Sequence, residues 1–296
     1  MTENRLEPMT GQRAAAEPYA TRFETEVTSI DGRRVWLERS HFFGASAGQP
    51  ADRGTVAATA VTDVELVDGE QVHVLADAPS FSVGHRVLCS VDWSFRMYCM
   101  RAHTASHVLL RVADRLLPDS SYAGLEIGPE TVRVDLETAA TVDDERLLEL
   151  DEAVNRVVWE SRPVSWDDEP VSAVRERDAV VFDDHADDAA VAKGRVRTVS
   201  IEDEKDRQRT GRFTATTGSP EPWDARACGG THVRNTREIG PVTLLGTSSP
   251  DADVTRIELA VGPAAIERRT AEKRAAFAAM GATDAALEDV PDDLES

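Results

Sequence analysis

The sequence has little lysine and no long apolar run. Lysine occurs at three of the 296 positions, Lys193, Lys205 and Lys273, whereas aspartate and glutamate together number 54 and give a formal net charge of −21. No apolar run approaches the roughly 20 residues that a membrane span needs. Residues 1–20 are polar and acidic, unlike a secretory signal. The sequence therefore predicts a cytoplasmic protein that does not enter a membrane.

The excess of acidic residues has two interpretations. The surface could repel nucleic acid. Alternatively, the composition is halophilic, adapted to a very salty cytosol in which the Debye length falls to about 3 Å at molar salt. The scarcity of lysine favours the second interpretation, under which net charge says little about partners.

The cysteines argue against a disulfide framework, because they number three, an odd count, and include no CxxC pair. Cys89 and Cys99 lie in apolar surroundings, which is typical of buried free thiols. Cys228 differs, because a histidine follows it at metal-ligand spacing.

The first part of the chain has the pattern of a small antiparallel β-barrel. Over residues 21–95, short apolar strands flank Asp31-Gly32 and Asp68-Gly69, which are hairpin-turn dipeptides. Residues 41–54 are rich in small and polar residues and are predicted to be a loop outside the core. Residues 1–20 are predicted to be a disordered leader.

The second part, residues 96–265, has the pattern of an α+β domain. Apolar residues at helical spacing run from Met97 to Leu116 and end before Pro118. A second helix is predicted over 147–158, and strands are predicted at 132–136, 196–201, 242–245 and 256–261. The acidic, poorly periodic stretch within 165–222 has the pattern of an insertion without an assigned role. Residues 266–296 are assigned to the end of an amphipathic helix, predicted from Pro263 to Met280, and an acidic tail.

Two histidines and a Cys–His pair form the pattern that carries chemistry. His103 and His107 are four residues apart on the predicted helix, so both imidazoles leave the same face. Alone, this spacing fits two partly buried helix histidines equally well. Cys228 and His232 are also four apart, with two glycines between them that can take positive φ and turn both ligands inward. Three nitrogens and one sulfur are a set that Zn²⁺ prefers, so the four residues predict one zinc site.

The spacing leaves open whether the zinc is catalytic or structural. Four protein ligands usually close a structural site, whereas a histidine-rich set more often accompanies a reactive metal. A zinc protease is not expected, because His103 is not followed by the glutamate of HExxH.

At these motifs the sequence resembles the freestanding alanyl-tRNA editing proteins of the AlaX type, which are related to the editing domains of alanyl- and threonyl-tRNA synthetases. The matching segments are Asp92-Trp93, 100–107, 226–233, 238–241 and 256–258, and residues 48–54 resemble the family's glycine-rich loop. The resemblance implies a barrel like those of translation factors followed by a zinc-dependent editing domain. It also implies hydrolysis of seryl- or glycyl-tRNA for alanine, with the aminoacylated 3′ end of tRNA as partner.

The resemblance and the positions beside the metal motifs give candidate substrate and RNA contacts. Thr104, Glu126 and Thr231 are placed nearest the amino acid; alternatively the threonines cap local turns and the glutamate faces solvent. Glu126 stands where relatives carry glutamine. The RNA-binding candidates are Gln49, Asp52, Arg234 and Arg237. No catalytic residue stands out beyond the metal site.

Two other functions fit the same residues. One is a deacylase for another tRNA, such as threonine-specific tRNA. The other is a non-catalytic RNA-binding module that zinc stabilises.

Overall fold

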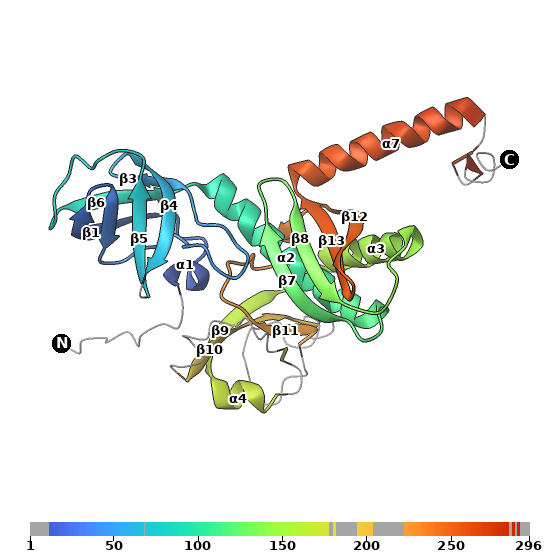
Figure 1. Ribbon diagram of the computed structural model, residues 1–296, viewed down its shortest axis with the longest axis horizontal. Helices are drawn as coiled ribbons and strands as arrows, with labels where there is room; N and C mark the ends of the chain where they lie inside the picture. The colour runs from blue at the N-terminus through green and yellow to red at the C-terminus, as the bar shows by residue number, and fades with distance from the viewer. Residues whose placement is uncertain are drawn as a thin grey trace.

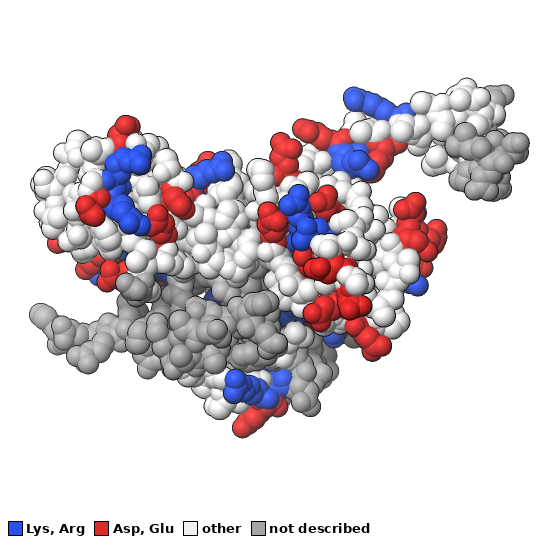
Figure 2. Space-filling model, in the orientation of Figure 1, with Lys and Arg blue, Asp and Glu red and all other residues white. Residues whose placement is uncertain are grey.

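The computed structural model describes residues 12–67, 69–177, 180–181, 194–203, 222–283, 286–287 and 289–290. A barrel lies at one end of the molecule, a mixed α/β domain follows it, and the C-terminal helix α7 (Pro263–Thr283) projects away from both (Figure 1). Acidic and basic side chains are interleaved over both parts on this face (Figure 2). In the described ranges no helix is long and apolar enough to span a membrane. The predicted fold class, an N-terminal barrel followed by an α+β domain, is confirmed.

Six antiparallel strands close the barrel in the order β1-β2-β5-β4-β3-β6. Their bounds are β1 (Arg22–Asp31), β2 (Arg34–Leu37), β3 (Gly54–Val56), β4 (Thr59–Val67), β5 (Glu70–Leu75) and β6 (Arg86–Val91). Alternate residues face the core, as in β6, where Val87, Cys89 and Val91 are buried. In the first predicted hairpin, Asp31 pairs with Arg34, so the turn consists of Gly32 and Arg33 and lies one residue later than predicted.

Residues 41–54 are not the peripheral loop that their composition predicts. Phe42 and Phe43 are fully buried, and Gln49 and Asp52 are almost so. Small residues allow this segment to run between the barrel and the second domain. Gly48 has φ +72, and a Cβ there would lie 2.1 Å from the Leu125 carbonyl oxygen, so only glycine fits against this strand.

The second domain is built around the long helix α2 (Trp93–Leu116), whose first turn is capped by the Asp92 side chain. The helix packs on a four-stranded sheet in the order β12-β13-β8-β7, and the helix α3 packs on α2 and β12. The bounds are β7 (Ser121–Ile127), β8 (Val132–Glu137), α3 (Asp144–Glu160), β12 (Val242–Asp251) and β13 (Val254–Val261). The short 3₁₀ helix η1 (Thr236–Ile239) lies against α2 and α3.

A second, three-stranded sheet has the order β11-β10-β9. Its strands are β9 (Val164–Pro170), β10 (Arg195–Ile201) and β11 (Asp224–Ala227), and the helix α4 (Val171–Arg175) follows β9. Residues 165–175 therefore have regular secondary structure, although their sequence is poorly periodic. The rest of the predicted insertion lies largely outside the described residues.

Two terminal predictions also change. Within the predicted disordered leader, residues 13–16 form the helix α1 (Arg13–Ala16), whose Ala14 and Ala15 are buried against Phe43. At the other end, α7 buries only Ala265 among its residues, and Ile266 and Phe277 are exposed. The helix is thus present but lacks the continuous apolar face expected of an amphipathic helix.

Candidate metal centre

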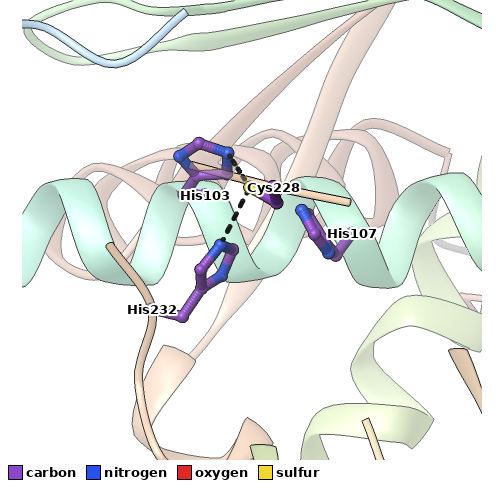
Figure 3. Close-up of side chains that lie close together, drawn as sticks. All are labelled: His103, His107, Cys228 and His232. Carbon is purple, nitrogen blue, oxygen red and sulfur yellow. Dashed lines mark hydrogen bonds between the residues drawn. The ribbon is translucent and has the colours of Figure 1, made fainter. Parts of the chain in front are cut away.

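The four predicted ligands lie together between α2 and the chain that follows β11. One ligand atom from each of His103, His107, Cys228 and His232 lies within 4.8 Å of the others. Figure 3 shows the side chains converging, with Cys228 Sγ 3.3 Å from Nε2 of His103 and 3.3 Å from Nε2 of His232. Ligands of one tetrahedral zinc, at 2.0–2.3 Å from it, are separated by about 3.5 Å. The donor set therefore suits a zinc ion, and the two separations from Cys228 Sγ lie close to this value.

The outward nitrogen of each imidazole faces an oxygen. His103 Nδ1 lies 3.2 Å from Gln49 Oε1, and His232 Nδ1 lies 3.2 Å from Thr104 Oγ1. His107 Nδ1 lies 3.8 Å from Asp224 Oδ2, and both atoms are buried without a hydrogen bond to any other described residue. Such outer acceptors fix the tautomer that leaves the other ring nitrogen free to bind a metal.

Burial keeps the three imidazoles neutral. It lowers the pKa of His103 to about 3, and it lowers the pKa values of His107 and His232 well below 6.5. A neutral imidazole has a free lone pair, which is the form that coordinates zinc.

Gly230 is required for space rather than for positive φ. Neither Gly229 nor Gly230 has positive φ, so that part of the sequence-based argument is wrong. A Cβ at position 230 would lie 2.0 Å from His103 Cε1, whereas at position 229 it would have no neighbour within 4 Å. The backbone of the second motif therefore packs directly on the His103 ring.

Two groups hold Cys228 in place. The Gly230 N–H donates to Cys228 Sγ at 3.4 Å. Arg197, a buried cation on β10, donates from Nη1 to the Cys228 carbonyl at 2.7 Å. Nothing in the local sequence pattern had indicated Arg197 or Asp224, because both reach the site only through the three-stranded sheet.

Gln49 and the two threonines surround the cluster. Gln49 Oε1 accepts from the Thr231 backbone N–H at 2.9 Å, and its Nε2 donates to the Thr231 hydroxyl at 3.0 Å. The Thr104 hydroxyl donates to the Met100 carbonyl and accepts from Val233 N–H as well as facing His232. The Thr104 hydroxyl therefore gives its one proton to the Met100 carbonyl, and its oxygen accepts from and orients His232. Gln49 is buried beside the cluster rather than exposed to RNA.

The remaining candidates lie apart from the cluster. The Asp52 side chain is fully buried in an ion pair with Arg96, which also donates to the Pro18 and His41 carbonyls and so joins α2 to the barrel. Glu126 is exposed on β7, with its carboxylate 3.2 Å from Arg133. Arg234 and Arg237 are exposed in the segment after His232.

Comparisons with known proteins agree with this site. The family model described as the threonyl and alanyl tRNA synthetase second additional domain matches residues 196–258, which include Cys228 and His232. The alanine–tRNA ligase of Pyrococcus abyssi is 31% identical over 263 residues, 87% of this chain and 26% of the ligase. That of Methanothrix thermoacetophila is 32% identical over 257 residues, 85% of this chain and 25% of the ligase.

These matches define a protein with the second additional domain shared by threonyl and alanyl tRNA synthetases. They agree with the resemblance found at the motifs, because the matched domain and the similarity to alanine–tRNA ligases over most of the chain fit an alanyl-tRNA editing protein. The chain spans about a quarter of the length of the ligases that it matches.

Proposed function

We propose that the protein is a zinc-dependent hydrolase that removes a wrongly attached amino acid from tRNA. The proposed substrates are seryl- and glycyl-tRNA for alanine, edited in trans. The observation that carries the proposal is the buried set of three imidazoles around Cys228, each facing an outer oxygen, in a chain related to alanine–tRNA ligases.

The ligands would be His103, His107, Cys228 and His232. When bound, zinc supplies a Lewis acid that polarises a carbonyl and lowers the pKa of water. The imidazoles are buried, whereas Cys228 and Gly229 are partly exposed, so we expect substrate to approach from the Cys228 side. Gln49 and Thr104 hold two of the imidazoles in place, and the Asp224 carboxylate faces the third.

Such an enzyme meets a physical need of alanine selection. A pocket shaped for alanine cannot exclude glycine, and it rejects an added hydroxyl poorly. A second site that hydrogen-bonds the serine hydroxyl works in the opposite sense, and can discriminate by about 10⁴-fold because alanine leaves the buried polar group unpaired. Thr231, buried beside Gln49, is the candidate for that contact.

We also propose that Arg234 and Arg237 contact tRNA phosphates, because both are exposed and follow the metal motif directly.

The name of the matched domain includes threonyl-tRNA synthetase, which makes threonine-specific tRNA the second candidate substrate. The four-ligand set favours a third possibility, a closed zinc site without chemistry.

A panel of charged tRNAs tests these possibilities. We expect hydrolysis of seryl- and glycyl-tRNA for alanine, with alanyl-tRNA and threonyl-tRNA spared. Cys228→Ala should lose bound zinc and hydrolysis while keeping its circular dichroism spectrum. The control Cys89→Ala, in the barrel core, should keep both. Unfolding of Cys228→Ala, but not of Cys89→Ala, would support structural zinc. A zinc-loaded protein that hydrolyses none of the charged tRNAs in the panel would contradict the proposal.

A further inference from the structure

Aromatic and arginine side chains follow one another along the surface beside the metal centre. Trp93, the first residue of α2, is 41% exposed, and its ring centroid lies 5.8 Å from that of Tyr19. The guanidinium of exposed Arg234 lies 4.3 Å from the Tyr19 ring centroid. The Arg53 carbonyl accepts from the N–H of Asp92, the residue before Trp93, at 2.7 Å. We call Arg53, Trp93, Tyr19 and Arg234 the arginine–aromatic strip.

The strip is held in place by its neighbours. The Tyr19 hydroxyl donates to Glu238 at 2.6 Å and accepts from the Arg234 backbone N–H at 3.0 Å. The Arg53 guanidinium lies 4.4 Å from the ring centroid of Phe95. A surface ordered before binding loses less entropy when a ligand docks on it.

The arginines of the strip are not neutralised by carboxylates. Neither Arg53 nor Arg234 forms an ion pair with any carboxylate that the structure describes, whereas Arg133, Arg146 and Arg156 each do so elsewhere on the surface. In a chain of net charge −21, this leaves cations available to an anionic ligand.

The chain connects the strip to the metal centre at two places. Arg234 follows His232 by two residues, and Trp93 precedes His103 by ten residues on α2, about 15 Å along the helix axis. A chain whose last residue is bound at the cluster can therefore extend its preceding residues over the strip.

We propose that the arginine–aromatic strip binds the unpaired 3′ end of tRNA, with a base stacked on Trp93 and phosphates near Arg53 and Arg234. Single-stranded RNA is recognised by stacking on aromatic rings and arginine planes and by cations along its backbone, and the strip combines all of these. The inference rests on the proposed function for the choice of RNA.

Binding of uncharged RNA tests the strip without any hydrolysis. The probes are a fluorescent single-stranded RNA ending in CCA and a blunt RNA duplex, both followed by anisotropy. Trp93→Ala should weaken binding of the single strand by about 5- to 100-fold, the effect of losing one stacked base. Trp93→Phe should restore most of the affinity. Phe277→Ala, which removes an exposed aromatic ring from α7, should have no effect.

Salt dependence tests the cations. Arg234→Gln should reduce the slope of log affinity against log salt by about 0.7, as expected for one phosphate contact on a single strand. Arg274→Gln, on exposed α7, should leave the slope unchanged. Wild-type affinity in Trp93→Ala, or an equal loss on the blunt duplex, would overturn the inference. Trp93-dependent binding by a protein that hydrolyses no charged tRNA would support the strip and contradict the proposed function instead.

Discussion

Gln49 Oε1 lies 3.2 Å from His103 Nδ1 and 2.9 Å from the backbone nitrogen of Thr231, so one barrel residue contacts both halves of the metal centre. An amide oxygen only accepts hydrogen bonds, and His103 must therefore carry its proton on Nδ1 and present Nε2 to Cys228.

Gln49→Ala should weaken zinc binding by about 10- to 100-fold, the usual effect of losing an outer partner of a ligand. Competition with a chromophoric chelator measures the affinity. Gln71→Ala, which removes another glutamine of the barrel, is the control and should bind zinc like the wild type. Equal affinities of the two variants would show that Gln49 does not orient His103.

Gly230→Ala should abolish stoichiometric zinc binding, because the added Cβ would lie 2.0 Å from the His103 ring. Gly229→Ala adds the same methyl group to the same loop where no atom lies within 4 Å, and should retain zinc. Elemental analysis of both purified variants decides the matter. Retention of zinc by Gly230→Ala would mean that the loop can move away from His103.

Glu126→Ala tests the sequence-based prediction that this residue contacts substrate. Its carboxylate is exposed and paired with Arg133, and an exposed pair contributes little. We therefore expect the rates of seryl- and glycyl-tRNA hydrolysis to stay within about twofold of wild type. Loss of a buried hydrogen bond to a charged group would instead reduce the rate by at least about tenfold. A selective loss on seryl-tRNA would instead restore Glu126 as the hydroxyl-binding residue.

His73, buried in the barrel, should make stability depend on pH. Burial lowers its pKa from 6.5 to about 4. Because the folded pKa is below the unfolded one, protonation favours unfolding. The stabilisation is complete above pH 6.5 and is lost as the pH falls toward 4, by about 3 kcal/mol in total.

Denaturant titrations at several pH values measure this contribution. The free energy of unfolding of His73→Asn should fall less steeply with acid over that window than that of the wild type. His85→Asn, at an exposed histidine, should follow the wild-type profile. Identical slopes for His73→Asn and the wild type would exclude His73 as the source.

The acidic composition predicts stabilisation by salt. Self-repulsion at a net charge of −21 is screened as ionic strength rises, so the thermal midpoint should increase up to and beyond about 1 M potassium chloride. A midpoint that falls steadily over this range would contradict the halophilic interpretation.

Local patterns were sufficient to predict α2, the hairpins and the four clustered side chains, because each depends on spacing within one short segment. The burial of residues 41–54 was not predictable from composition. It depends on Arg96, more than forty residues later, which offsets the burial of Asp52. The strand β11 was missed for the same reason: its charged side chains Asp224 and Arg226 are buried only because they pair with each other and with Asp114.

The contact between Gln49 and His103 limits how modular this protein is. All four clustered residues lie between Trp93 and Val261, yet one histidine takes its orientation from the barrel, and the Arg197 guanidinium donates to the Ala15 carbonyl of the N-terminal segment. A fragment cut at the apparent domain boundary would keep every metal donor and lose part of what aligns them. In a lineage of such proteins, the barrel could not be exchanged or discarded without a compensating change at position 103 or its surroundings.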